Sequence, residues 1–286
     1  MKETYLNKEK APCTIKELLK KQGVSSTNWR KWKREATFFL EQQQVEFNTT
    51  IKPEQTLTVE YTPINTIAPE YHPLDIVYED DFLLAINKPA DLLVHPTTSK
   101  ASGTLANFVT HYFQQKNLDY SYHPVSRLDR DTSGLVLLAK TTRIHNLLSK
   151  THIEKTYLAL LNGILPAQQG LINLPIGRNP TSIIERKVAL DGKPALTYYK
   201  LLKNYQNKVS LVQLKLLTGR THQIRIHTKH LNCPIYADSL YDKHIENSRQ
   251  FLHAQSIEFT HPITQNTLKL TTRLPADLKQ AIRKFL

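Results

Sequence analysis

The densest group of reactive side chains lies between residues 127 and 134. The segment reads Arg-Leu-Asp-Arg-Asp-Thr-Ser-Gly and runs directly into the apolar residues 135–139, Leu-Val-Leu-Leu-Ala. An apolar run of this length is typical of a buried strand, so we expect the charged segment to form a loop directly before the start of that strand. Asp129, an acid between two arginines, is the candidate for chemistry. For Asp131 and the two hydroxyl residues after it, hydrogen bonds to local backbone amides are the simpler interpretation.

A second candidate is a tyrosine within residues 155–163, which read Lys-Thr-Tyr-Leu-Ala-Leu-Leu-Asn-Gly. The alternation of a strand would bury Tyr157 together with Ala159 and Leu161 on one face. From the residues alone, a tyrosine of the hydrophobic core is the simpler interpretation.

A third segment, residues 217–231, gathers positive charge at the start of an expected helix. Gly219 is expected to end a strand, and Thr221 is expected to cap the helix that follows. On this helix His222 and Arg225 share a face. The segment therefore predicts a cationic helix start beside a strand end.

Three histidines in the third segment raise the question of a metal site: His222, His227 and His230. Zinc sites of this kind use a His-Glu-x-x-His arrangement or a nearby acidic ligand, and the segment has neither. We therefore expect no metal.

The elements that must position these segments are strands and helices in mixed order. They show no regular alternation of strand and helix, and no glycine-rich phosphate loop. This pattern predicts an α+β fold with a mainly antiparallel mixed sheet and flanking helices. The expected strands are 76–78, 82–86 and 209–217, and the expected helices are 104–113, 143–148 and 275–286.

The chain is expected to divide into a small domain at residues 1–61, a linker at 62–74 and a large domain at 75–286. The linker is expected because prolines interrupt a segment without periodicity. In the small domain, apolar residues at helical spacing and a basic stretch predict two helices. The first helix is expected at Ile15, Leu18 and Leu19, before a break at residues 23–26, and the second at about 27–34. The expected strands are 38–40, 45–47 and 57–59.

Residues 13–60 resemble the alpha-L RNA-binding motif, a small module found in a ribosomal protein and in several RNA-modifying enzymes. The order of a helix, a turn, a basic helix and short strands is similar. Two details differ, because Glu54-Gln55 and Asn48-Thr49 stand where Gly-Asp and Asn-Gly are usual. The resemblance implies that this domain contacts RNA, and a purely structural copy of the module is the alternative.

Net charge favours an anionic partner. The 286 residues include 38 Lys and Arg against 25 Asp and Glu, a formal charge of +13. Nucleic acid is the commonest partner of such a surplus, and a merely basic soluble protein is the alternative. Hydrophobic residues make up 40% of the chain, which is ordinary for a globular protein and excludes a disordered one.

Cysteine content and hydropathy predict a cytoplasmic protein. Cys13 and Cys233 cannot form a disulfide framework, which favours a reducing compartment. No apolar run approaches the ~18 residues of a membrane span. The first residues also lack the apolar stretch of a signal peptide.

Taken together, the three reactive segments resemble the RNA pseudouridine synthases that modify uridines in ribosomal and transfer RNA. The Arg-Leu-Asp block followed by Thr-Ser-Gly is similar to that family's central motif. The Lys-x-Tyr and Gly-Arg-x-His-Gln-Ile-Arg segments follow it in the family's order. The resemblance spans about residues 75–275, with supporting matches at 87–89, 95–96, 192–197 and 252–254.

The resemblance implies a role for each reactive side chain. Asp129 would be the catalytic carboxylate, acting as a nucleophile or by supporting glycosidic cleavage. Arg225 would keep it ionised, Tyr157 would stack on the uracil, and Arg127 would fill the gap left by the flipped base. Further residues implied to bind the substrate are Arg130, Thr132, Lys155, Arg220, His222 and Gln223.

Because pseudouridine is an isomer of uridine, the resemblance implies no cofactor. It also implies an RNA partner and a monomer that needs neither metal nor membrane. Two departures leave the subgroup and the RNA target open: Ser126 stands where histidine is frequent, and Ala90-Asp91-Leu92 lacks a usual glycine.

Two other functions stay open at this point. A catalytically inactive RNA-binding or ribosome-assembly protein could use the same fold. A nucleoside hydrolase would cleave the same bond and release free uracil. Substitution of Asp129 and analysis of the products separate all three.

Overall fold

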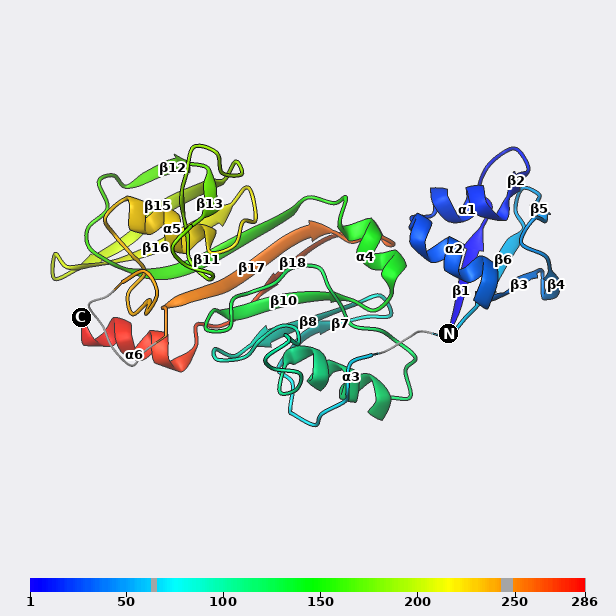
Figure 1. The fold of residues 1–286 in the computed structure, drawn as a ribbon, viewed down its shortest axis with the longest axis horizontal. Coiled ribbons are helices and arrows are strands. Elements are labelled where there is room, and N and C mark those ends of the chain that lie inside the picture. The colour runs from blue at the N-terminus through cyan, green and yellow to red at the C-terminus, as the bar shows by residue number, and fades with distance from the viewer. Residues whose placement is uncertain (63–65, 243–248, 286) are drawn as a thin grey trace.

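The computed structural model describes residues 1–62, 66–242 and 249–285. A small domain formed by the first 61 residues lies at one end of the molecule. A larger domain, built on one long sheet, takes up the rest (Figure 1). No helix in the described ranges is both long and apolar enough to cross a membrane.

The small domain packs two helices, α1 (Ile15–Lys21) and α2 (Ser26–Glu35), against a four-stranded antiparallel sheet of order β1-β6-β3-β4. Both helices begin at hydroxyl caps, since the side chains of Thr14 and Ser25 accept hydrogen bonds from backbone N–H groups three residues later. The strands are β1 (Lys2–Leu6), β2 (Cys13–Thr14), β3 (Thr37–Leu40), β4 (Gln43–Val45), β5 (Thr50–Ile51) and β6 (Thr56–Glu60).

Strand β1 is not predicted by the sequence, because an acid occupies its buried face. Glu3 is 8% exposed, and its carboxylate accepts hydrogen bonds of 2.6 Å from the hydroxyls of Tyr5 and Tyr61. A buried carboxylate is tolerated when donors satisfy it. The apolar alternation that would mark the strand is therefore interrupted.

The large domain contains a ten-stranded sheet of order β12-β15-β16-β11-β17-β10-β8-β7, with β18 beside β17 and β9 beside β10. All its pairs are antiparallel except β10 with β17. Its strands are β7 (Ile76–Glu79), β8 (Leu83–Lys88), β9 (His123–Pro124), β10 (Ser133–Ala139), β11 (Ile153–Asn162), β12 (Gln169–Asn173), β15 (Leu196–Tyr205), β16 (Val209–Leu216), β17 (Leu252–Thr260) and β18 (Thr267–Thr271). The α+β class and the mainly antiparallel mixed sheet are confirmed.

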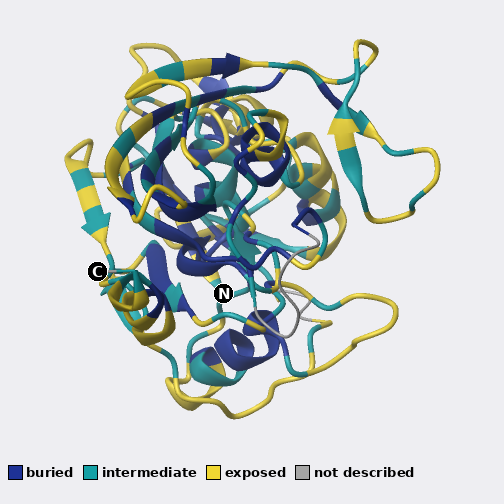
Figure 2. Ribbon diagram, turned by 90° about the vertical axis from the view of Figure 1, so that its left-hand side faces the viewer, coloured by how far each residue is buried: buried dark blue, intermediate teal, exposed yellow. Residues whose placement is uncertain are grey.

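Helices cover both faces of this sheet. Apolar residues of α3 (Leu105–Gln115) and of α4 (Thr142–Leu148) pack against alternate residues of β8 and β10, so these helices lie on opposite faces. Helix α5 (Gln223–His230) lies over β15 and β16 (Figure 1). Helix α6 (Ala276–Lys284) lies near the start of β17 (Figure 1). Figure 2 shows the buried strands in the interior, surrounded by exposed loops.

A separate hairpin, β13 (Ile176–Arg178) with β14 (Arg186–Val188), stands beside α5. Residues 66–74 of the predicted linker lie along α3, where the ring of His72 stacks on Phe108 at 4.4 Å between centroids. Residues 63–65 of the predicted linker lie outside the described residues. Every strand and helix predicted for the large domain is present with shifted ends, and residue 286 of the last predicted helix lies outside the described residues.

Gly134 allows the parallel pair to form. Its φ is +115°, a conformation that other residues rarely adopt, and an added Cβ would lie 2.2 Å from the carbonyl oxygen of Ala254. Glycine is therefore required where β10 leaves the loop 127–132 and meets β17.

Few side chains join the two domains. Arg143 at the start of α4 donates hydrogen bonds of 3.2 Å to the backbone oxygen and the side-chain oxygen of Gln22, and its guanidinium lies 4.8 Å from the ring centroid of Tyr5. An added Cβ on Gly23 would lie 2.7 Å from a side-chain carbon of Leu147, so the side chain of Leu147 packs directly on the backbone of Gly23. The small domain is therefore seated on α4.

Candidate active site

Asp129 lies in the loop between β9 and β10, and this loop is held by its own backbone and by a buried lysine. The N–H of Thr132 donates to the carbonyl of Asp129 at 3.1 Å, which closes a turn. The ammonium group of Lys88 donates to the carbonyls of Pro89, Leu92 and Arg130, each at 2.8 Å. Burial lowers the pKa of Lys88 to about 7. The loop is thus fixed from inside the protein.

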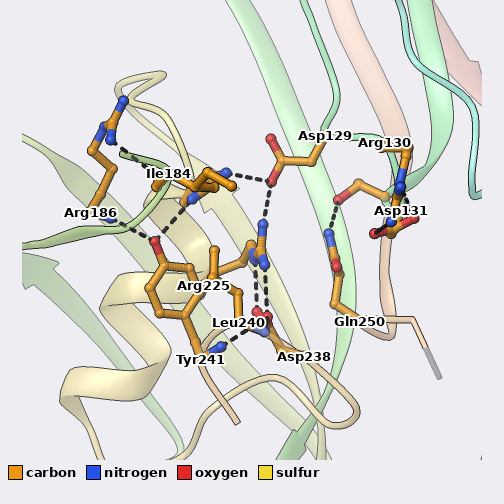
Figure 3. Close-up of polar contacts among 12 residues, drawn as sticks. Asp129, Arg130, Asp131, Ile184, Arg186, Arg225, Asp238, Leu240, Tyr241 and Gln250 are labelled. Carbon is orange, nitrogen blue, oxygen red and sulfur yellow. Dashed lines mark hydrogen bonds and ion pairs between the residues drawn. The ribbon is translucent and has the colours of Figure 1, made fainter. Parts of the chain in front are cut away.

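The carboxylate of Asp129 pairs with Arg225. The Nη1 atom of Arg225 donates to Oδ2 of Asp129 at 3.0 Å, while its Nε and Nη2 atoms donate to the two oxygens of Asp238, both at 2.7 Å (Figure 3). Arg225 is 6% exposed. Burial opposes its charge, but the hydrogen bonds that it donates to Asp238 and the charges of both acids raise its pKa. One guanidinium therefore bridges a fully buried acid and a partly exposed one.

His222 approaches Asp129 from the other side. Its Nε2 atom lies 3.8 Å from Oδ2 of Asp129, and its Nδ1 atom lies 2.9 Å from the hydroxyl of Tyr241. That hydroxyl accepts from the backbone N–H of Arg186 at 2.9 Å, so it can donate its own proton to Nδ1, which leaves Nε2–H facing the carboxylate. Burial lowers the pKa of His222, which favours this neutral form.

Tyr241 also packs under the cations of α5. Its ring lies 5.0 Å from the guanidinium of Arg225 and 5.3 Å from the ammonium of Lys229. The backbone N–H groups of Leu240 and Tyr241 donate to Oδ1 of Asp238. Asp238 and Tyr241 are not predicted by the sequence, where their only signal is the spacing Asp-x-x-Tyr in a segment without periodicity.

Tyr157 lies on β11 in the main core beside the loop. It is 7% exposed, and its ring packs in the same cluster as Ala159 and Leu161. Burial, with a smaller effect from the charge of Asp129, raises the pKa of its hydroxyl. The structure thus places a neutral aromatic ring within the electrostatic reach of the carboxylate.

The two arginines of the loop differ in their surroundings. Arg127 is exposed and makes no hydrogen bond or ion pair with the residues that the structure describes. Arg130 is bonded to Asp131 at 3.0 and 3.2 Å and lies 3.4 Å from Asp91. Arg127 is therefore the one with its guanidinium available.

Helix α5 begins at Gln223, one residue later than predicted. Thr221 does not cap it; His222 does, with a left-handed φ of 56°. The turn before the helix is instead shaped by Gln223, since its Oε1 accepts from the N–H of Arg220 at 2.9 Å and from the hydroxyl of Thr218 at 2.8 Å. This turn carries His222 to Asp129.

The remaining predicted binding residues lie around the site, and their side chains differ in burial and in hydrogen bonding. Gln223 is buried, and its amide also bonds Leu196 and Thr197, so its side chain is not free for a substrate. Thr132 is buried and accepts from Gln250 at 3.2 Å, and a direct substrate contact does not fit that placement either. Arg220 is exposed, and Lys155 is half-buried on β11, where burial lowers its pKa.

Comparison with known sequences decides the family. The model of the family described as RNA pseudouridylate synthase matches residues 82–230, which is more than half of the chain. The chain belongs to the RNA pseudouridine synthases. The match encloses Asp129, Tyr157 and Arg225, and it confirms the recognition and the enzyme class, an isomerase, that the sequence predicted. No three His, Cys, Asp or Glu side chains group as a metal site in the described ranges.

Relatives and solved structures agree with this assignment. RNA pseudouridine synthase YhcT of Bacillus subtilis is 39% identical over 77% of this synthase and 75% of its own length. Ribosomal large subunit pseudouridine synthase D of Pasteurella multocida is 35% identical over 79% and 75%. The structure of human RNA pseudouridylate synthase domain containing 1 superposes with a TM-score of 0.59 at 26% identity, covering 74% of this synthase and 94% of that chain.

Proposed function

We propose that this pseudouridine synthase converts specific uridines of a structured ribosomal or transfer RNA, with Asp129 as its catalytic carboxylate and without a cofactor. The observation that carries the proposal is the chain of contacts from Asp238 through Arg225 to Asp129. It holds an ionised acid at a site where the other polar groups are largely buried. The similarity to a synthase named for the large ribosomal subunit favours ribosomal RNA as the first substrate to test.

The reaction breaks the bond between C1′ of the sugar and nitrogen 1 of uracil. The detached ring turns, C1′ bonds carbon 5, and the proton of carbon 5 is lost as nitrogen 1 gains one. Atoms and electrons balance within the nucleotide, so neither an oxidant nor an energy source is required. Asp129 can serve either as the nucleophile at C1′ or as the charge that supports cleavage, and both roles need it ionised. The 3.0 Å contact with Arg225 favours that state.

Tyr157 is proposed to hold the detached uracil. A base that has left its sugar needs a flat partner, and stacking on an aromatic ring contributes about 1–3 kcal/mol in proteins that bind single strands. Its raised pKa keeps the hydroxyl protonated, so the ring adds no second negative charge beside Asp129.

Arg127 is proposed to enter the RNA stack when the target nucleotide swings out. The base must leave its helix to reach Asp129, and a side chain that fills the gap lowers the cost of unstacking. Arg127 is exposed, unpaired among the described residues, and two residues from the acid. The surplus of 13 positive charges would hold the phosphates around it.

We also propose that the protein acts as a monomer. The two cysteines are buried and free, which agrees with a reducing compartment such as the cytoplasm. Neither the oligomeric state nor the compartment enters the chemistry proposed for Asp129.

The test is release of tritium from RNA that contains carbon-5-tritiated uridine. The wild-type protein is expected to release tritium, and Asp129→Asn is expected to lose at least about a thousandfold of the rate while still binding RNA. Asp131→Asn is the matched control, because this neighbouring acid pairs with Arg130 instead of Arg225. RNA binding without tritium release from the wild type would favour an inactive RNA-binding protein, and free uracil would favour a hydrolase.

A further inference from the structure

Side chains from outside the loop donate hydrogen bonds to residues 131 and 132 of the segment that carries Asp129. The Nη1 atom of Arg249 donates to the carbonyl of Asp131 at 3.2 Å. Next to it, the buried amide of Gln250 donates to the hydroxyl of Thr132 at 3.2 Å (Figure 3). These contacts come from residues about 120 positions away in the chain, so only the folded domain brings them to the loop.

Arg249 is itself held rigidly. Its Nε and Nη2 atoms donate to the two carboxylate oxygens of Asp277 at 2.7 and 3.0 Å, a two-point pairing that fixes the plane of the guanidinium. Its Nη1 atom also donates to the carbonyls of Gln250 and Leu252. The side chain of Arg249 is only 12% exposed.

Asp277 lies in the first turn of α6, and this helix is anchored in the core. Leu278 and Ala281 are buried in a cluster with Leu160 and Val209 of the central strands. Burial alone would raise the pKa of Asp277, but the hydrogen bonds from Arg249 and from backbone N–H groups hold it below its usual value. The acid is therefore ionised and fixed, and α6 provides its support.

A cavity of about 500 Å³ lies along this contact. Its lining includes Lys88, Ser133, Arg249 and Asp277. Apolar packing cannot steady the loop on the side where space is open. Hydrogen bonds from Lys88 and Arg249 supply the support there, to the carbonyls of Arg130 and Asp131.

We propose that Arg249 is a positioning residue of the isomerisation, and that Asp277 of α6 acts through it. By holding the carbonyl of Asp131, Arg249 keeps the loop in the conformation that places Asp129 against Arg225. The inference rests on the proposed role of Asp129. It predicts that the last helix of the chain sets the rate of a reaction whose substrate it does not touch.

The experiment compares Asp277→Asn, Arg249→Lys and the double variant in single-turnover tritium release, with enzyme in excess over RNA. The plateau rate reports the chemical step and is independent of the folded fraction, while the half-saturating concentration reports RNA binding. Glu154→Gln is the matched control, because it breaks an ion pair with Lys215 that joins β11 and β16 and involves no residue of the loop or of α6. Hydrogen exchange of the amides at 128–133 is measured in the same proteins.

We expect each single variant to lower the plateau rate about tenfold, which corresponds to about 1.4 kcal/mol, with half-saturation within twofold of wild type. The double variant should be no slower than Arg249→Lys, because the two residues act as a unit. Exchange at 128–133 should rise in all three, and Glu154→Gln should match wild type.

Plateau rates within twofold of wild type in both single variants would overturn the proposal. So would a loss confined to half-saturation, which would make Arg249 an RNA contact, or an equal loss in Glu154→Gln. If the wild type itself releases no tritium, the proposed function fails instead. The hydrogen-exchange measurement then tests whether Arg249 holds the loop, since unchanged exchange at 128–133 in the variants would show that it does not.

Discussion

The side chain of Arg225 contacts both acids of the candidate site. Two nitrogens of its planar guanidinium donate to Asp238, and the third donates to Asp129. A lysine carries the same charge but cannot span two carboxylates with fixed directions. The arrangement thus depends on the shape of guanidinium as much as on its charge.

Replacing Arg225 by lysine should therefore impair catalysis more than binding. We expect Arg225→Lys to lower the single-turnover plateau by ~100-fold, or ~2.7 kcal/mol, because a buried charged hydrogen bond to Asp129 is lost. Half-saturation should change less than threefold. Arg34→Lys is the control, since Arg34 is exposed on α2 of the small domain. Equal losses in the two variants would contradict this role for Arg225.

His253 is a buried histidine with both ring nitrogens engaged. Nδ1 lies 3.0 Å from the hydroxyl of Ser133, and Nε2 lies 2.9 Å from that of Thr272. Burial, with help from the charge of Arg249, lowers its pKa to about 4. The folded protein keeps this ring neutral, whereas the unfolded chain does not in mild acid.

This difference predicts a pH dependence of stability. Between the folded pKa of about 4 and the unfolded value of about 6.5, the unfolded state binds more protons, so stability is lost as pH falls through that window. From pH ~7.5 to ~5, His253 should account for on the order of 1 kcal/mol of the loss in unfolding free energy. Urea unfolding of His253→Gln should show a correspondingly shallower loss, and exposed His152→Gln should follow wild type.

At this scale, the sequence identified the charged loop, the tyrosine strand and the cationic helix through residue types that are crowded or repeated in one segment. It could not identify Asp238 or Tyr241, because nothing local marks them. They matter only through contacts with Arg225 and His222 made in the folded state. Gln223 shows the converse, since a polar residue in a reactive segment serves the turn instead of the substrate.

Among the elements, strands β10 and β17 tolerate the least change in the side chains at their contact. They form the one parallel pair of the large sheet as far as the structure describes it, and the loop with Asp129 feeds directly into it. Gly134 sits at the entry, against the backbone of Ala254. Any side chain there would push the strand, and with it the loop, away from β17.

We expect Gly134→Ala to destabilise the protein by about 3 kcal/mol or more, because a backbone clash adds to a strained positive φ. Thermal unfolding and urea unfolding measure this. Gly219→Ala is a matched control, since an added Cβ there meets nothing within 4 Å. A Gly134→Ala protein as stable as wild type would mean that β17 can shift without cost.

Elements with a clear apolar period were predicted, including α3 and β16, because burial on one face or both leaves a readable pattern. Strand β1 was not predicted because Glu3 stands on its buried face, and the start of α5 was misplaced because Gln223 bonds the turn before the helix. Both differences arise from a polar side chain whose partner is supplied elsewhere. Sequence periodicity carries no information on such partners.

At the scale of the molecule, positive charge also gathers on the small domain. Exposed Lys16 and Arg30 lie 5.1 and 5.5 Å from the ring of Trp29, and exposed Lys33 lies 5.7 Å from that of Phe47. The two rings stack at 6.1 Å. Cations around an aromatic pair form a surface suited to RNA phosphates and bases.

Changing Lys16, Arg30 and Lys33 together to glutamine should weaken RNA binding and flatten its salt dependence. If all three contact phosphates, the slope of log affinity against log salt should fall by about 2–3, with an unchanged plateau rate. Fluorescence anisotropy over a salt series measures the slope. A control variant replaces three exposed lysines of the large domain, Lys200, Lys269 and Lys279. An unaltered slope in the small-domain variant would assign that domain a structural role.

The two acids around a single guanidinium leave the innermost part of the site with an excess of one negative charge, within a protein whose formal charge is +13. Such a centre repels phosphate groups while the rim attracts them. The RNA strand is thereby sorted as it arrives: its anionic backbone stays outside, and only the uncharged ring and sugar gain by going deeper. Discrimination between the parts of one nucleotide thus requires no contact with base edges.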